Sequence, residues 1–237
     1  MLRPLNILRA GFAIALFSII TSCHKEDPGP LQEVRKDYSI VDFDRLEMGS
    51  AFNIEVEQGN AFSLQVKGDR RNIDDLDVYK SGSTLVIEFD DNANRHHDTY
   101  INITMPGLKG VNFSGASVSK IRGFDSEEDL DLYLSGASTA QLDANYREID
   151  LVISGASNLV LFGSGDEFRA EISGASTLYA FDYPVRQAMI DISGASEGKV
   201  AVTDELKVTA EGASSILYHG NPSVISNISG ASTVQKN

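Results

Sequence analysis

Apolar and polar residues alternate in short segments through the second half of the chain. In five segments every second residue is apolar: Leu130–Leu134, Ile149–Ile153, Phe168–Ile172, Ala188–Ile192 and Leu206–Ala210. The residues between the apolar ones are mostly polar, and a shorter alternating segment follows most of the five after a turn. A period of two predicts β-strands with one buried face.

A tetrapeptide, Ser-Gly-Ala-Ser, separates the longer segments from the shorter ones. Its glycines, with one degenerate copy that begins at Glu211, are Gly115, Gly136, Gly155, Gly174, Gly194, Gly212 and Gly230. Successive glycines lie 18 to 21 residues apart, which is the signature of a repeat architecture. Glycine permits an unusual backbone conformation and alanine permits close approach, so we expect structural turns at these seven positions.

Strands repeated at this spacing predict an all-β solenoid, a parallel β-helix with about 18–21 residues per rung. Each strand would pair with its equivalent one rung away, at a spacing of about 4.8 Å. An antiparallel sandwich is the alternative, but it does not require the same tetrapeptide at every turn. Which serine of each tetrapeptide faces inward is left open, because a corner can shift the alternation.

Residues 38–110 are also rich in predicted strands but lack the tetrapeptide. Alternation over 52–56 and 62–66, on either side of Gln58-Gly59-Asn60, predicts a hairpin. We expect this irregular part to cap the solenoid and to stack continuously on the repeats of residues 111–237, because an open end would expose pairing edges.

Residues 1–22 resemble a bacterial lipoprotein signal peptide. Arg3 and Arg9 form a short positive region before an apolar run, Ala10–Ile20, which is too short to span a bilayer. Ile20-Thr21-Ser22-Cys23 resembles the lipobox, in which the cysteine becomes the acylated first residue. We therefore expect lipidation of Cys23 and membrane association through the acyl chains, with a plain signal peptide as the alternative.

Residues 23–37 are predicted to form a tether, since Asp27-Pro28-Gly29-Pro30 suits neither a helix nor a central strand. The acidic pair after Lys25 resembles the surface-export signal of Bacteroidetes lipoproteins, and a solvated spacer is the alternative. These features favour the outer membrane, with the protein at the cell surface or on the periplasmic face.

The composition of the 237-residue chain narrows the classes of partner. Its formal net charge of -14 disfavours binding to nucleic acid, because phosphate backbones would be repelled. Its single cysteine excludes an internal disulfide framework and a multi-cysteine zinc site. We expect no cofactor.

Three sequence patterns suggest chemistry, and each has a simpler interpretation. Ser117-Val118-Ser119-Lys120 matches a Ser-x-x-Lys pattern, but its partner motifs are missing. His96 and His97, within the polar segment Asp90–Asp98, could bind a transition metal, but a hairpin loop between two strands explains them better. The acidic residues of 125–129 could attract Ca²⁺, but they lack a glycine-punctuated loop and suit a solvated rung corner. We therefore predict no metal site and no catalytic residue.

The sequence resembles the putative autotransporter adhesin, head GIN domain family over residues 38–237. The matching features are the segment Thr99–Pro106, the segment Leu108–Ser117 and the repeated Ser-Gly-Ala-Ser turns. The resemblance implies a fold similar to the right-handed, pectin-lyase-type β-helix and a role in cell adhesion. The family has no assigned catalytic residues, so it supplies no functional positions.

Two classes of function remain from the sequence. The first is a non-enzymatic binding module of the cell envelope, an adhesin whose ligand is a glycan or a surface protein. The second is a carbohydrate-active enzyme of the polysaccharide-lyase kind, since a fold does not determine a function. The absence of tryptophan and of clustered basic residues disfavours the enzyme. An envelope scaffold is a further alternative.

Overall fold

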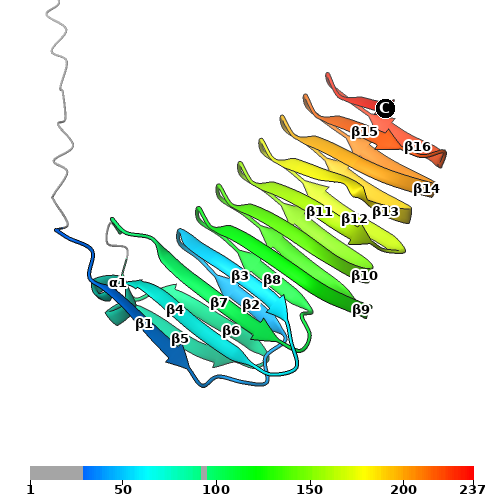
Figure 1. Cartoon of the computed structure of the whole chain (residues 1–237). Coiled ribbons are helices and arrows are strands. Elements are labelled where there is room, and N and C mark those ends of the chain that lie inside the picture. Colours follow the sequence, from blue (N-terminus) through cyan, green and yellow to red (C-terminus); the bar gives the residue numbers. More distant parts are fainter. Residues whose placement is uncertain (1–28, 92–94) are drawn as a thin grey trace, which may run out of the picture. The chain divides into compact units, whose positions relative to one another are not determined.

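The computed structural model describes residues 29–91 and 95–237, and a compact unit extends from Leu31 to Asn237 (Figure 1). The predicted signal peptide, Cys23 and the first part of the predicted tether lie outside the described residues. Strand β1 (Glu33–Tyr38) pairs antiparallel with β4 (Ser63–Asp69), so the folded unit begins within the segment expected to be a tether. Charged residues on both faces of β1 conceal the alternation, and such charges are typical of edge strands.

The repeats form a parallel β-solenoid, as expected, in which every rung supplies two runs of strand (Figure 1). We call the runs that follow the corners ladder A and the runs that precede them ladder B. The longest strands bend and contribute to both ladders, and they are β9 (Val118–Leu134), β10 (Thr139–Ile153), β13 (Thr177–Ile192) and β14 (Glu197–Ala210). Ladder A also contains β11 (Asn158–Ser164), β15 (Ser215–His219) and β17 (Thr233–Lys236), and ladder B contains β8 (Gly110–Phe113), β12 (Glu167–Ile172) and β16 (Ser223–Ile228).

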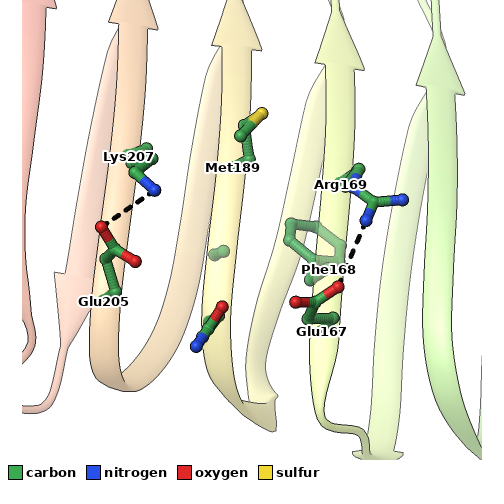
Figure 2. Close-up of a pocket in the computed structure, with 8 residues that line it drawn as sticks. Glu167, Phe168, Arg169, Met189, Glu205 and Lys207 are labelled. Atoms are coloured by element: carbon green, nitrogen blue, oxygen red, sulfur yellow. Dashed lines mark hydrogen bonds and ion pairs between the residues drawn. The ribbon is translucent and has the colours of Figure 1, made fainter.

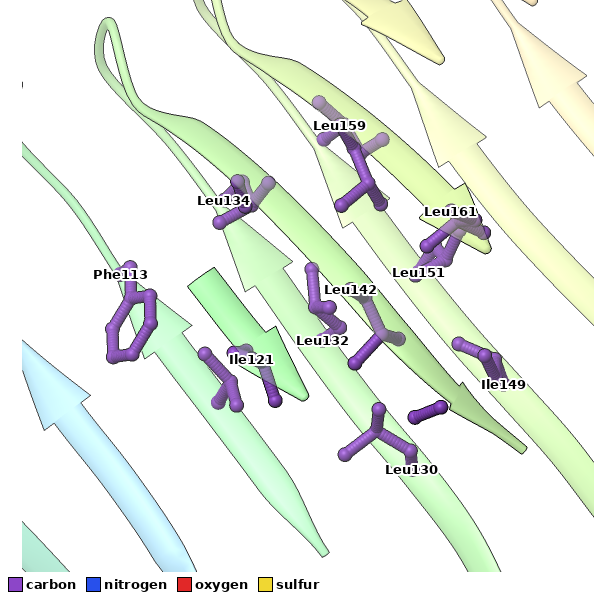
Figure 3. Close-up of a cluster of buried hydrophobic side chains, with 14 of the residues drawn as sticks. Phe113, Ile121, Leu130, Leu132, Leu134, Leu142, Ile149, Leu151, Leu159 and Leu161 are labelled. Atoms are coloured by element: carbon purple, nitrogen blue, oxygen red, sulfur yellow. The ribbon is translucent and has the colours of Figure 1, made fainter. Parts of the chain in front are cut away.

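Equivalent positions of successive rungs lie directly above one another. In ladder B, Leu132 pairs with Leu151, Leu151 with Ala170, and Ala170 with Ile190. The inward side chains therefore form columns, which merge into one continuous core (Figure 3). The parallel register confirms the solenoid and excludes the antiparallel sandwich for residues 111–237.

Each tetrapeptide forms a corner with the same backbone geometry. The seven glycines have φ between 70° and 80°, a left-handed conformation that side chains disfavour. The amide of the following alanine donates to the glycine carbonyl of the preceding corner, as in the 2.8 Å bond from Ala156 to Gly136. Corners are therefore bonded to corners along the whole stack.

The structure also decides which serine of each tetrapeptide faces inward. The second serine is buried at every corner, and these residues are Ser117, Ser138, Ser157, Ser176, Ser196, Ser214 and Ser232. Some of their hydroxyls bond along the stack, since Ser117 Oγ donates to Ser138 Oγ at 3.1 Å. The inward serine column thus accompanies the glycine column.

Residues 38–110 complete both ladders at one end of the stack. In ladder B, β2 (Arg45–Met48) pairs parallel with β8 and with β6 (Thr84–Phe89), and β5 (Leu76–Ser81) forms an antiparallel edge on β6. In ladder A, β3 (Phe52–Gln58) pairs parallel with β9 and with β7 (Thr99–Met105). The expected continuous stacking on the repeats is confirmed.

The predicted hairpin over residues 52–66 is wrong. Strand β7 lies between β3 and β4, parallel to the first and antiparallel to the second. Strands β3 and β4 are close together in the sequence, but each of them pairs with β7. The side chains of Ile101 and Ile103 on β7 are buried. Alternation of apolar and polar residues identifies a strand but not the strand beside it. The neighbouring strand is decided by which apolar faces are buried together in the folded protein.

The only helical element among the described residues is α1 (Arg70–Asp74), a single turn after β4. Asp69 caps it by accepting a hydrogen bond from the amide of Arg71. No helix in the described ranges has the length and apolar character needed to cross a membrane.

Candidate functional site

The sequence-predicted patterns with possible chemistry do not converge on one site. Ser117 is buried and bonded to Ser138, whereas Lys120 of the same Ser-x-x-Lys pattern is exposed on the outer face of ladder A. A serine nucleophile needs a base within reach, so this pair lacks the required geometry.

His96 and His97 lie in the connection between β6 and β7. These strands belong to different ladders, so the segment is a crossover between them and the predicted hairpin loop is wrong. His96 is exposed and His97 is half-buried, with His97 Nε2 3.9 Å from Asp69 Oδ2. Within residues 29–91 and 95–237, no group of three or more His, Cys, Asp or Glu residues has a metal-binding arrangement.

The acidic residues of 125–129 occupy a bend within the long strand β9, at the far side of the rung from the tetrapeptide. Two of them form ion pairs with neighbouring rungs. Asp129 Oδ1 lies 2.6 Å from Arg147 Nη2, and Glu128 Oε1 lies 3.0 Å from Lys109 Nζ. These pairs provide a structural explanation for the acidic cluster.

Ladder B carries a shallow pocket of about 200 Å³ beside β12, β13 and β14 (Figure 2). Figure 2 shows Arg169 directed toward Glu167 and Lys207 directed toward Glu205, at 3.2 and 2.9 Å. Arg169 also pairs with Glu148, and burial raises the pKa of the Glu148 carboxyl while the guanidinium opposes this. The charged groups of this pocket form ion pairs with one another. The pocket volume is also smaller than the roughly 300–1,000 Å³ typical of ligand sites.

A larger groove, of about 370 Å³, lies on the outer face of ladder A where β4, β7, β3 and β9 meet. We call it the Tyr100 groove. Its lining residues are Asn53, Ile54, Glu55, Lys67, Tyr100, Asn102, Val118 and Lys120. An adjoining hollow of about 390 Å³ shares Lys67 and Tyr100 and extends toward His97.

Strand alternation positions the side chains of the Tyr100 groove. In β7, Thr99, Ile101 and Ile103 are buried, so Tyr100 and Asn102 point outward. The register places Lys67, Tyr100, Asn53 and Val118 in one row across four strands. Asn102, Glu55 and Lys120 form the next row. Three strands from the irregular region, β4, β7 and β3, and one strand from the repeats, β9, therefore build the floor.

The polar side chains of the groove differ in whether they are bonded within the protein. Lys67 Nζ lies 3.0 Å from Glu33 Oε2, and the Tyr100 hydroxyl donates a hydrogen bond to Asp98 Oδ2 at 3.3 Å. No hydrogen bond or ion pair within the described residues involves the side chains of Asn53, Glu55, Asn102 or Lys120, all of which line the groove. The arrangement offers an exposed ring beside unpaired amide and charged groups.

Asp69 anchors the edge of this region, where it follows Gly68 of the adjoining hollow. Its side chain is 1% exposed and accepts hydrogen bonds from Arg71 Nε at 2.7 Å, Arg71 Nη2 at 2.8 Å and the amide of Gln32 at 2.9 Å. The Arg71 guanidinium holds the pKa of the Asp69 carboxyl well below its usual range, although burial opposes this shift. The carboxylate thereby links the residue before β1 to β4 and α1.

We expect Asp69→Asn to destabilise the protein at neutral pH by about 1–3 kcal/mol, because charged acceptors of several bonds are lost. A carboxyl with a lowered folded pKa contributes stability above its unfolded pKa of about 3.9 and loses it as the pH falls toward the folded value. The difference in unfolding free energy between wild type and variant should therefore shrink between about pH 7 and about pH 3. Urea denaturation at both pH values measures it, and a constant difference would contradict the assignment.

Comparison with known proteins identifies the family. The sequence profile described as "Putative auto-transporter adhesin, head GIN domain" matches residues 42–222. The chain belongs to this family. A comparison with curated proteins gives no match.

Several solved structures share the fold of this chain. A putative adhesin from Bacteroides fragilis is 19% identical, with a TM-score of 0.76 over 87% of this chain and 97% of that one. A putative adhesin from Parabacteroides distasonis is 20% identical, with a TM-score of 0.71 over 88% of this chain and 98% of that one. A structure from the same organism titled a putative lipid binding protein is 18% identical, with a TM-score of 0.70 over 86% and 96%. At these identities the similarity shows the fold alone.

The Tyr100 groove cannot be recognised from the sequence alone. Alternation in Thr99–Met105 already indicates that Tyr100 and Asn102 face outward, which is the available signal. The sequence does not indicate the neighbours of that strand, and they decide whether an exposed tyrosine stands alone or beside Asn53, Val118 and Lys120.

Proposed function

We propose that this head GIN protein is a non-enzymatic binding module, an adhesin held at the outer membrane by acyl chains on Cys23. The observation that carries the proposal is the outer face of ladder A. There the side chains of successive strands stand in register from Lys67 through Val118 to Thr139, on a backbone fixed by pairing on both sides. A rigid, regular surface suits recognition of an extended ligand, because little conformational entropy is lost on binding.

The location of the perturbed carboxyl groups supports a binding role over catalysis. A glycosidase or lyase needs titratable groups that face the substrate, with pKa values suited to proton transfer. Glu148 pairs with Arg169, and Asp69 is held by Arg71. Neither carboxyl group lines the Tyr100 groove. Each of these two carboxylates is paired with an arginine of the protein, which is the arrangement of a structural ion pair and not of a group that faces a substrate.

The experiment is an array of glycans and extracellular matrix proteins probed with soluble protein comprising residues 24–237. This protein retains the whole compact unit, Leu31–Asn237, with its continuous core. We expect saturable binding to a ligand on the array. The same preparation should not degrade polygalacturonate or alginate and should not hydrolyse chromogenic esters.

Two results would contradict the proposal. Robust turnover that a single substitution abolishes would favour the carbohydrate-active enzyme. Failure to bind any glycan or protein would favour an envelope scaffold, whose partners are neighbouring envelope components.

A further inference from the structure

We infer that the Tyr100 groove binds a neutral hexose unit of a glycan, with the apolar face of the sugar on the Tyr100 ring. This inference rests on the proposed binding function and assigns it a place on the molecule. Tyr100 is 44% exposed as a residue, and Val118, two strands away in the same row, is 48% exposed. An exposed ring and an exposed aliphatic group in one groove form a small apolar platform.

The polar groups around this platform suit sugar hydroxyls. Asn53 and Asn102 each offer an amide donor and an amide acceptor, and Glu55 and Lys120 offer a charged acceptor and a charged donor. These four side chains form no hydrogen bond or ion pair within the described part of the chain. A sugar presents alternating donors and acceptors beside an apolar ring face, so it can satisfy the amides and cover the platform together.

The charges of the groove favour a neutral sugar over an acidic one. Glu55 and Lys120 face each other across adjacent strands, and Lys67 is already paired with Glu33. The groove therefore has no surplus positive charge, while the chain as a whole carries a formal charge of -14. A uronate or sialate would be repelled at long range and would find no free cation beyond Lys120.

The backbone around the groove disfavours a peptide strand as the ligand. A peptide that adds to a sheet needs an edge strand with unpaired amides and carbonyls. Strands β7, β3 and β9 each have a neighbour on both sides in ladder A. The groove therefore offers side chains alone, and its volume of about 370 Å³ suits a compact ligand.

The test compares wild-type protein of residues 24–237 with Tyr100→Ala on an array of neutral glycans, followed by calorimetric titration of a binding glycan. We expect Tyr100→Ala to weaken binding at least about tenfold, because the stacking platform is removed. Tyr100→Phe keeps the ring and should retain affinity within about threefold. Binding should change little between about 0.05 and 0.5 M salt, because the ligand is uncharged.

The matched control is Tyr133→Ala. Tyr133 is 45% exposed, nearly the same as Tyr100, but it lies on ladder B outside the groove. Its loss should leave glycan affinity within about twofold of wild type. Thermal unfolding of all variants shows that each is folded before binding is compared.

The outcomes separate this inference from the proposed function. Glycan binding that survives Tyr100→Ala unchanged would overturn the groove assignment and leave the binding module intact. Binding to proteins or to acidic glycans only would overturn the neutral-sugar assignment and again leave the binding module intact. Binding to nothing on either array would overturn both.

Discussion

Replacing Gly155 by valine should destabilise the protein by about 2–4 kcal/mol, a large effect for one substitution. Gly155 has φ of 77°, where a β-branched residue is strongly disfavoured. A Cβ atom there would collide with the carbonyl oxygen of Gly136 and lie 3.1 Å from its amide nitrogen. Both contacts are to backbone that is bonded within the stack, so neither can move aside cheaply. Chemical denaturation measures the loss.

Two variants serve as controls for Gly155→Val. Gly230 has φ of 70°, and its added Cβ would lie 2.5 Å from the carbonyl oxygen of Gly212. It belongs to the last rung, however, where every residue of β16 is exposed, and this rung can fray at lower cost. Gly107 has no neighbouring atom within 4 Å of an added Cβ, so Gly107→Val should be nearly neutral. Similar losses for Gly155→Val and Gly107→Val would contradict the stacked-corner explanation.

Replacing Cys23 by alanine in the full-length chain should remove the protein from the membrane fraction of a bacterium that processes lipoproteins. The motivation is the Ile20–Cys23 lipobox pattern after a short apolar run. Each buried methylene contributes about 0.8 kcal/mol to membrane binding, so loss of all acyl chains should shift nearly the whole population. Fractionation and labelling with a fatty-acid analogue measure this result.

The matched control for Cys23→Ala is Ser22→Gly, which keeps a small residue before the cysteine. It should retain both the label and the membrane association. Continued labelling of Cys23→Ala, or its unchanged presence in washed membranes, would show that Cys23 is not the attachment point.

Local patterns were sufficient to predict the fold of the repeats, because the same alternation and the same corner recur in each rung. The alternation in Leu130–Leu134 predicts one buried face, and the structure buries all three leucines. The spacing of the glycines implies stacking, and the register of Leu132 on Leu151 confirms it. Equivalent side chains in successive rungs have equivalent neighbours, so local and long-range information coincide.

The same reasoning failed where the neighbours are not equivalent. Ser50 has φ of 73° and lies directly beneath Gly115, whose alanine neighbour Ala116 donates to the Ser50 carbonyl at 3.3 Å. This is an additional corner of the stack, formed by Gly49-Ser50-Ala51, but its sequence differs from the tetrapeptide and it precedes Gly115 by 65 residues. The intervening strands β4 to β7 return to the stack before the regular repeats begin.

The sequence by itself determined the strand content, the position of the corners and the class of solenoid, because these depend on residue type and spacing along the chain. Only the tertiary structure decided that β7 separates β3 from β4, that the second serine of each corner faces inward, and that Tyr100 lies beside Asn53 and Val118. The physical reason is that an alternating strand specifies which face is buried but leaves its partner open. The partner is chosen by how the whole core closes, and the outer surface that could bind a ligand is a consequence of that choice.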